Sequence, residues 1–421
     1  MGEWIDTIIG EQATLQRGID ITRAKQSPGA VPVISSGGVS SFHDTPAASG
    51  PGVILGRKGV VGSVYFVVSD YWPHDTTLWV KDFHGNDRRF VYYFFKWMAP
   101  RIATMDVGSA NPTLNRNHVH PIEIRWPPLA EQHAIAHILG TLDDKIELNR
   151  RMNQTLEAMA RALFKSWFVD FDPVRAKHAL SKVEGAEGRP SASSGQAFPG
   201  LPKPFADLFS DSFEDSALGE IPKGWAVKGI DEIANFLNGL ALQKHPRGDG
   251  ATLPVIKIAQ LRKGDTEGAD RCNTSVPPEY VINDGDVLFS WSGSLECVLW
   301  AGDRGALNQH LFKVTSTLFP KWFYYLWVHE HLASFRHTAA GKATTMGHIQ
   351  RHHLSDAKIV VPESDVLNAT DKMISPIIEQ VMQRRVESRT LAALRDTLLP
   401  KLISGDLRLR DTEQRMKEEA A

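Results

Sequence analysis

The sequence predicts an α+β protein in which two duplicated, mixed α/β domains are separated by two long antiparallel coiled-coil helices, with pseudo-two-fold symmetry. Three observations predict it: an internal repeat, strand-like segments punctuated by turn residues, and two extended helical patterns at 129–168 and 364–403. The length of 421 residues is enough for two or three domains, and a hydrophobic content of 42% is ordinary for a globular protein.

The internal repeat is seen when the second half of the chain is aligned with the first. Trp4 and Gly18 have the same spacing as Trp225 and Gly239, and further matches follow in the same order at a shift of about 220–235 residues. They are VPVIS at 31–35 with LPVIK at 253–257, GVILGRKGVVG at 52–62 with DVLFSWSGSLE at 286–296, FVYYFFKWM at 90–98 with WFYYLWVHE at 322–330, and IEIRWPP at 122–128 with AKIVVPE at 357–363. A period this long does not fit a solenoid and predicts a duplicated domain-plus-helix unit.

Each repeat begins with short β-branched and aromatic segments separated by Gly, Pro, Asn and Asp, a pattern typical of strands and loops. One aromatic helix is expected inside each domain, at 90–98 and at 322–330. The spacing of its aromatic residues favours packing on a core over stacking on bases.

A long helical segment closes each repeat. Gly140 with Thr141 predicts a break in the first segment, and Ser375 with Pro376 predicts a break at the matching place in the second. Beyond the breaks, apolar residues at spacings of three and four predict a seam between the helices, the alternative being that each helix packs on its own domain. The helices beyond the breaks would form a rod of roughly 40 Å, which is close to the length of one turn of B-DNA. The residues assigned to the seam are Leu142, Ile146, Asn149, Leu156, Leu163, Ile377, Val381, Leu391, Leu398 and Leu402.

Composition excludes several classes of protein. No segment has 18 successive apolar residues, so we expect no membrane-spanning helix. MGEWIDTIIG lacks the pattern of a secretory signal, and Cys272 and Cys297 predict two free thiols in a cytoplasmic protein. With a net charge of −2, any contact to nucleic acid has to come from local clusters of positive charge.

The segment WPPLAEQHAIAHILGTLDDKIELNRRMNQTLEAMARALFKSWFVDFDPV at 126–174 strongly resembles the central conserved region of specificity subunits of type I restriction–modification systems. LRDTLLPKLISGDLRL at 394–409 is similar to the end of their second conserved region. The resemblance implies a bacterial or archaeal subunit that reads an interrupted double-stranded DNA sequence with two target-recognition domains. It also implies that the paired helices dock two methyltransferase subunits, through which restriction (translocase) subunits join.

This resemblance, together with the repeat, sets the expected domain boundaries. The Gly, Pro and Ser content of 181–204 is typical of an exposed linker. The expected parts are 1–128 for the first target-recognition domain, 129–170 for the first spacer-helix region, 171–214 for the linker, 215–362 for the second target-recognition domain, 363–410 for the second spacer-helix region and 411–421 for a charged tail.

No segment of the sequence matches the catalytic motifs that its residues suggest. SANPTL at 109–114 lacks the second proline and the aromatic residue of a methyltransferase motif, and GKAT at 341–344 lacks the upstream glycine and the Ser/Thr of a P-loop. His352 and His353 have no partner cluster in the sequence. We therefore assign no catalytic and no metal-binding residue, and the resemblance implies that S-adenosylmethionine, ATP and Mg²⁺ are held by partner subunits.

Candidate DNA contacts come from two pairs of matched segments. Neither domain is basic: residues 1–128 contain 12 Lys+Arg against 11 Asp+Glu, and 215–362 contain 15 against 15. LGRKGVVG at 55–62 has two cations flanked by glycines, whereas FSWSGS at 289–294 offers hydroxyl groups and an indole. TLNRNH at 113–118 and HIQRHH at 348–353 offer amides and arginines for bases or phosphates. The assigned residues are Arg57, Lys58, Asn115, Arg116, Asn117, Ser290, Trp291, Ser292, Lys342, Gln350, Arg351 and His352, and weaker candidates are Arg17, Arg23, Lys25, Lys244, Lys257, Arg262 and Lys263.

Two alternative functions remain open from the residues. One is a helical scaffold that pairs with a partner and never reads sequence. The other is a methyltransferase or nuclease with an unrecognised active site.

Overall fold

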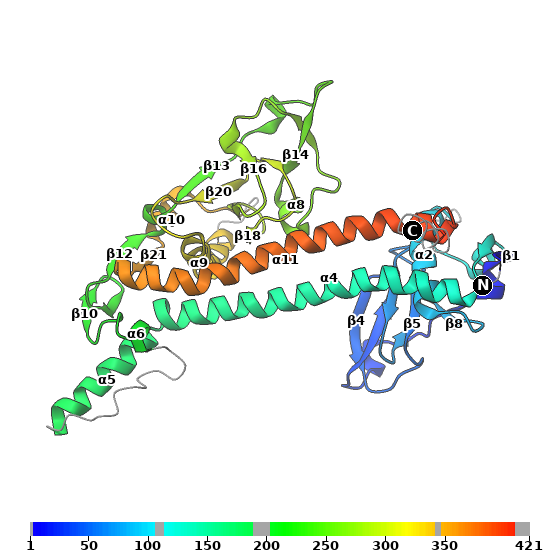
Figure 1. The fold of residues 1–421 in the computed structure, drawn as a ribbon, viewed down its shortest axis with the longest axis horizontal. Helices are drawn as coiled ribbons and strands as arrows, with labels where there is room; N and C mark the ends of the chain where they lie inside the picture. The colour runs from blue at the N-terminus through cyan, green and yellow to red at the C-terminus, as the bar shows by residue number, and fades with distance from the viewer. Residues whose placement is uncertain (1–2, 106–112, 188–202, 342–346, 409–421) are drawn as a thin grey trace, which may run out of the picture. The chain divides into compact units, whose positions relative to one another are not determined.

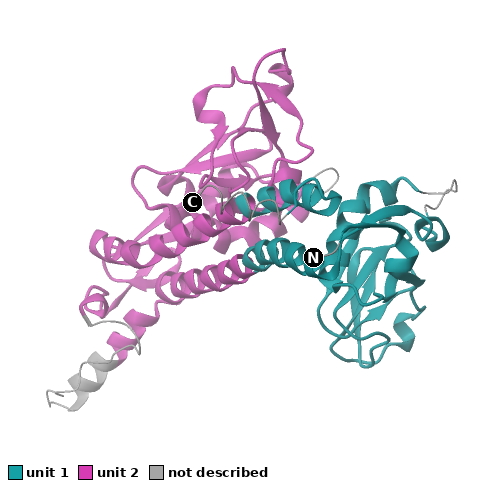
Figure 2. Ribbon diagram, turned by 45° about the vertical axis from the view of Figure 1, so that its right-hand side comes forward, with its two compact units in different colours: residues 1–147, 390–421 teal, residues 148–389 magenta. Residues whose placement is uncertain are grey.

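The computed structural model describes residues 3–105, 113–187, 203–341 and 347–408. The chain divides into two compact units, unit 1 with residues 1–147 and 390–421 and unit 2 with residues 148–389 (Figure 2). Because the division passes through both long helices, each unit contains one mixed α/β domain and a part of each helix. The charged tail expected at 411–421 lies outside the described residues.

The domain of unit 1 is built on short strands (Figure 1). Its main sheet is antiparallel, in the order β2 (Thr14–Arg17), β8 (Thr77–Asp82), β5 (Gly52–Gly56) and β6 (Val64–Val67). A second sheet has the order β4 (Gly38–His43), β3 (Val31–Ser35) and β7 (Trp72–Pro73), with β3 and β7 parallel, and β1 (Ile5–Ile8) pairs with β9 (Glu123–Trp126). The helices are α1 (Ile9–Gln12), α2 (Arg88–Ala103) and α3 (Arg116–Val119), with a 3₁₀ turn at Arg23–Lys25.

The domain of unit 2 repeats this plan. Its antiparallel sheet has the order β13 (Asn235–Asn238), β20 (Leu311–Thr315), β17 (Val287–Ser290) and β18 (Cys297–Leu299). The second sheet has the order β15 (Arg271–Asn273), β14 (Thr252–Ile256), β19 (Gly305–Leu307) and β16 (Val281–Ile282), and β12 (Ala226–Gly229) pairs with β21 (Lys358–Val361). The helices are α7 (Ile230–Ile233), α8 (Ile258–Lys263), α9 (Lys321–Ala340) and α10 (Arg351–Asp356). The matching strand orders confirm the duplication and the predicted fold class.

The aromatic helices pack as the sequence predicts. In α2, Phe90, Tyr93 and Phe95 are buried against the main sheet of unit 1, and in α9 Trp322 and Phe323 are buried in the core of unit 2. These rings are therefore core residues and are not exposed for stacking on bases.

Helices α4 (Leu129–Phe164) and α11 (Ser364–Ser404) are each continuous, so the predicted breaks at Gly140 and at Ser375 are wrong. Gly140 serves close packing instead. A Cβ there would lie 2.6 Å from Cζ of Arg89, whose guanidinium donates to the carbonyl of Gly140 at 3.0 Å. The Ser375 hydroxyl donates to Asp371 within the helix at 2.5 Å, one turn earlier.

The two long helices contact each other in both units, and each contact pattern is antiparallel. In unit 1, Arg395 pairs with Asp143 at 2.6 Å and Arg408 pairs with Glu131 at 3.1 Å. In unit 2, Arg385 of α11 pairs with Glu157 of α4 at 2.6 Å.

Of the predicted seam residues, Asn149 makes a hydrogen-bonded contact between the two helices. Asn149 is fully buried and donates to Glu387 at 2.8 Å and to Ser388 at 3.3 Å. The seam residues of unit 1 are Leu142, Ile146, Leu391, Leu398 and Leu402, those of unit 2 are Asn149, Leu156, Leu163, Ile377 and Val381, and all of them are buried or partly buried.

Each long helix also contributes to the core of the domain that comes from the other repeat. Leu399 and Leu402 of α11 are buried in unit 1 with Phe94, and Ala160 and Phe164 of α4 are buried in unit 2. The alternative in which each helix packs only on its own domain is therefore excluded.

Parts of the segment 171–214 fold onto unit 2. A π-helical turn at Lys165–Val169 ends α4, and α5 (Asp172–Glu187), α6 (Lys203–Ala206) and the hairpin of β10 (Phe213–Ser216) and β11 (Gly219–Pro222) follow. Phe171 and Phe209 are buried in the core, while residues 188–202 lie outside the described residues. Among the helices described, none is both long enough and apolar enough to cross a membrane.

Candidate nucleic-acid interface

In unit 1 the structure brings the two predicted DNA-contacting segments together. Arg57 and Lys58 follow β5, and their amides donate to the carbonyl of Thr76 at 2.9 and 3.0 Å. The amide of Leu114 donates to the carbonyl of Arg57 at 2.9 Å, and Lys58 forms an isolated bridge with Thr113. The side chain of Lys58 is exposed, as contact with a phosphate requires.

The two segments border an open pocket of about 970 Å³ in unit 1. Its charged and amide side chains are Gln16, Arg17, Asp20, Arg57, Asp75, Asn115 and Arg116. Arg17 pairs with Asp75 at 3.0 Å, and Arg57 donates to the carbonyl of Asp75 at 3.3 Å. Burial, followed by the nearby positive charge of Arg17, lowers the pKa of Arg57, and Asp75 opposes this shift. The pocket therefore presents three arginines, Arg17, Arg57 and Arg116, beside two carboxylates, those of Asp20 and Asp75.

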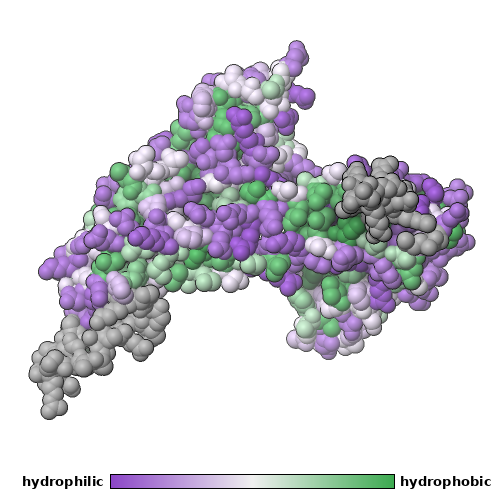
Figure 3. Space-filling model, in the orientation of Figure 1, coloured by the Kyte–Doolittle hydropathy of each residue, from purple (hydrophilic) through white to green (hydrophobic). Residues whose placement is uncertain are grey.

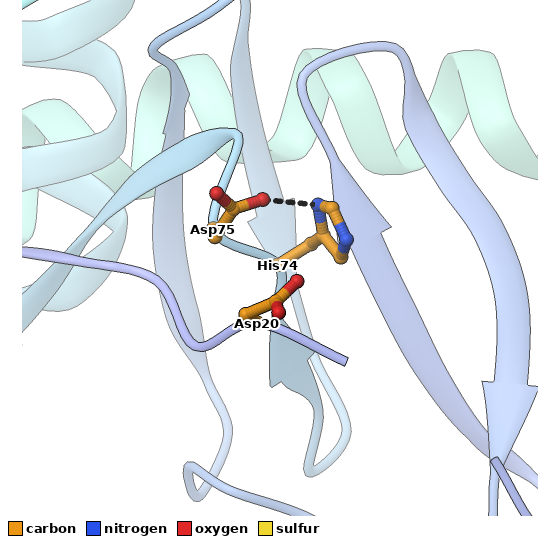
Figure 4. Close-up of side chains that lie close together, drawn as sticks. All are labelled: Asp20, His74 and Asp75. Atoms are coloured by element: carbon orange, nitrogen blue, oxygen red, sulfur yellow. Dashed lines mark ion pairs between the residues drawn. The ribbon is translucent and has the colours of Figure 1, made fainter. Parts of the chain in front are cut away.

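Asp20, His74 and Asp75 form a group whose possible ligand atoms lie within 4.8 Å of one another (Figure 4). Carboxylate and imidazole side chains suit a divalent cation. However, Asp75 already pairs with Arg17 and also lies 3.2 Å from Nδ1 of His74, which itself is 3.0 Å from the hydroxyl of Thr76. Because the adjacent Arg17 repels a cation, and because Asp75 and His74 have other partners, the group fits a polar recognition surface better than a metal centre.

Helix α3 places the second set of predicted residues at the rim of the pocket. The Asn115 side chain caps this helix by accepting from the amide of Asn117 at 3.0 Å. Arg116 reaches back to β2 and donates to the carbonyl of Leu15 at 3.5 Å. The three side chains of Asn115, Arg116 and Asn117 are exposed.

In unit 2 the matching loop differs from expectation. Ser290 is fully buried and its hydroxyl donates to the carbonyl of Ser294 at 2.8 Å, which closes the loop. Ser292 is 4% exposed, and its hydroxyl lies 3.1 Å from Nδ1 of His310. Contrary to the expectation from the sequence, these two hydroxyl groups are not exposed for contact with DNA.

Trp291, at the position matched to Arg57, is partly exposed. Its indole donates to Oδ1 of Asn238 at 2.9 Å and to the carbonyl of Gln309 at 3.1 Å. The ring also packs against the rings of His310 and His348. The indole thus holds an amide side chain at the surface of the domain.

Helix α10 corresponds to α3. The amide of Ile349 donates to the carbonyl of Trp291 at 2.9 Å, which repeats the Leu114–Arg57 contact of unit 1. Gln350, Arg351 and His352 are exposed, and Arg351 donates to the carbonyl of Phe236 at 3.3 Å. Lys342 lies outside the described residues.

Comparison with known proteins decides the family. The model of the type I restriction modification DNA specificity domain matches residues 3–158 and 222–394, one match for each repeat. The chain belongs to the specificity-subunit family of type I restriction–modification systems. Its role is DNA recognition and not catalysis.

Individual specificity subunits agree with this assignment. The chain is 26% identical over 332 residues to the specificity subunit of the type I restriction enzyme MjaIX of Methanocaldococcus jannaschii, covering 76% of this chain and 69% of that protein. It is 26% identical over 331 residues to the HindI specificity subunit of Haemophilus influenzae, covering 70% of this chain and 71% of that protein. The solved S subunit from M. genitalium has the same fold, with a TM-score of 0.59, 15% identity and coverage of 95% of this chain and 96% of that one.

Sequence reasoning missed part of the specificity subunit's pocket. Asp20 and Asp75 were not candidates, and Arg17 was only a weak one. Asp75 lies 58 positions after Arg17, so no local pattern connects them. The alignment of Gly18 with Gly239 could have identified Arg17, since the residue before each glycine differs between the repeats.

A second surface lies on the outer face of α4 within unit 2. Leu148, Met152 and Met159 are 50%, 37% and 49% exposed and lie on one side of the helix because their spacings are four and seven residues. In the view of Figure 3, hydrophobic atoms are seen along α4 between hydrophilic ones. We call these three residues the α4 stripe.

Proposed function

We propose that this specificity subunit reads an interrupted, bipartite target in double-stranded DNA, with one half-site read by the domain of each unit. The observation that carries the proposal is the repeated juxtaposition of a β-loop with the start of a short helix, at Arg57 and Leu114 in unit 1 and at Trp291 and Ile349 in unit 2. The backbone arrangement is the same while the side chains differ, and an asymmetric target requires such a difference.

The two long helices are proposed to set the number of unread base pairs between the half-sites. A continuous helix of 36 residues is roughly 54 Å long. The antiparallel pairs Asp143–Arg395 and Glu157–Arg385, one in each unit, support a rigid pair of helices. A rigid spacer fixes the spacing because bending or stretching the helices costs free energy.

The α4 stripe is proposed to dock a methyltransferase subunit, and two such subunits would join the chain and carry the S-adenosylmethionine. Restriction subunits with ATP and Mg²⁺ would assemble on that complex. An exposed apolar stripe on a helix is a common site of protein association. Substituting Met152→Glu together with Met159→Glu should therefore reduce methyltransferase binding at least tenfold, and Leu318→Glu, an apolar site of unit 2 outside the stripe that is 79% exposed, is the control.

Mapping methylated adenines in cells with and without this chain tests the main proposal. The expected result is one bipartite motif with a fixed gap that disappears when the chain is removed. A purified complex that binds random and selected duplexes equally at physiological salt would support the scaffold alternative and overturn the proposal.

A further inference from the structure

In each unit, the glycine that follows the first strand of the main sheet lies against the turn that precedes the neighbouring strand. A Cβ on Gly18 would lie 2.0 Å from the carbonyl oxygen of His74, and a Cβ on Gly239 would lie 2.2 Å from that of Asn308. The next residues form equivalent parallel bridges, Ile19 with His74 and Leu240 with Asn308. Only glycine fits this approach, so the backbone at this place is the same in both domains.

The side chains around this shared backbone differ completely. In unit 1, Arg17 pairs with Asp75 and Arg57 donates to the carbonyl of Asp75. In unit 2 the equivalent positions are Asn238, Gln309 and Trp291. Trp291 donates both to Asn238 and to the carbonyl of Gln309, so the indole makes the bond that the guanidinium makes in unit 1.

A neighbouring position, in contrast, carries the same side chain in both domains. Arg116 and Arg351 are both arginine, and each donates to a carbonyl of the first strand of the main sheet, that of Leu15 or of Phe236. A group that is the same in both domains positions the short helix and does not distinguish two half-sites. Discrimination has to come from positions where the backbone is kept and the chemistry is exchanged.

We propose that this position reads one base pair in each half-site, a G·C pair by Arg17, Arg57 and Asp75 in unit 1 and an A·T pair by Asn238 and Gln309 in unit 2. The inference rests on the proposed function. A guanidinium pairs with O6 and N7 of guanine, a carboxylate accepts from N4 of cytosine, and an amide pairs with N6 and N7 of adenine.

The contacts among the residues of each unit support the proposed reading of the two base pairs. Arg17 is 57% exposed at its side chain and Asp75 19%, so the ion pair can present both charges to one base pair. Phosphates repel a carboxylate, which favours a base edge as the partner of Asp75. In unit 2 the bond from Trp291 fixes which side of the Asn238 amide carries the oxygen, as reading of adenine requires.

The test uses the full chain assembled with its methyltransferase subunits and a duplex library randomised across both half-sites. Arg17→Gln, at an exposed site that does not threaten folding, should reduce the preference for G·C at one position of one half-site about tenfold or more. The triple exchange Arg17→Asn, Arg57→Trp and Asp75→Gln should move that position toward A·T. Asn238→Arg should change the other half-site only, and Lys81→Gln, an exposed cation of β8, should change neither.

The experiment distinguishes failure of the inference from failure of the proposed function. If the unmodified complex selects a bipartite target and Arg17→Gln leaves every preference unchanged, or weakens all sequences equally, the inference is overturned while the proposed function stands. If the unmodified complex shows no sequence preference, the proposed function fails and the inference fails with it.

Discussion

Arg395 of α11 donates from Nη1 to Oδ1 of Asp143 on α4 at 2.6 Å. The second oxygen of this carboxylate accepts from the hydroxyl of Tyr93 at 2.7 Å, and burial together with this bond raises the pKa of Tyr93. One carboxylate thus joins both long helices to the aromatic helix α2 within unit 1. The side chains of Asp143 and Arg395 are 23% and 16% exposed, so the pair is shielded from most of the solvent.

Asp143→Asn should lower the free energy of unfolding by about 1.5–3 kcal/mol, because it removes the shielded carboxylate partner of the Arg395 guanidinium and leaves only the exposed Asp396. Thermal and denaturant unfolding followed by circular dichroism measure the change. The matched control is Asp396→Asn, since Asp396 also pairs with Arg395 but is 59% exposed, and its loss should cost less than about 1 kcal/mol. Equal effects of the two variants would contradict a structural role for Asp143.

Gly140→Ala should destabilise unit 1, although alanine normally stabilises the interior of a helix by about 1 kcal/mol relative to glycine. The new methyl group would overlap Arg89, which Asp144 holds through two hydrogen bonds at 2.6 and 2.9 Å. In an Arg89→Ala background the same substitution should stabilise the protein. If Gly140→Ala raises the melting temperature in both backgrounds, the close approach does not constrain this position.

Stability should fall at acidic pH through His329 of unit 2. Burial, followed by the positive charge of Arg161, lowers the pKa of His329 from 6.5 to about 4. Because the unfolded chain binds the proton first, the contribution is complete above pH 6.5 and is lost as the pH falls toward 4. The loss is at most about 3 kcal/mol.

His329→Gln removes this titration, so the dependence of the free energy of unfolding on pH between 6.5 and 4 should become shallower. Denaturant titrations at several pH values measure it, and His133→Gln, at a side chain that is 60% exposed, is the control. An unchanged slope in His329→Gln would rule out this histidine as the cause.

Lengthening both long helices by one turn tests the proposed spacer. Four residues inserted after Glu147 and four after Arg389, where the two units meet along the chain, add about 6 Å to each helix and nearly keep the seam in phase. The preferred gap between half-sites should grow by one or two base pairs, since each base pair adds about 3.4 Å. Selection from duplexes with different gaps measures it, and an unchanged preferred gap would count against the spacer.

The repeat and the helix seam were predictable because their signals are periodic and local. Leu402 and Val381 recur at helical spacing, and Trp4 to Gly18 repeats as Trp225 to Gly239, so neither requires knowledge of distant contacts. The predicted break at Gly140 was wrong because the residue that packs against this glycine is distant in the sequence. A glycine in a helix indicates either an end or a close neighbour, and the neighbour, Arg89, lies 51 positions away.

Amino-acid order alone therefore specifies the duplicated architecture, the long helices and the kinds of loop that carry exposed polar groups, because spacing and residue type encode them. Folding in three dimensions decides which polar groups remain exposed. It buries Ser290 and Ser292 while it brings Arg17, Arg57 and Asp75 into one pocket. Burial and pairing depend on contacts between segments far apart in the chain, and no local pattern records those contacts.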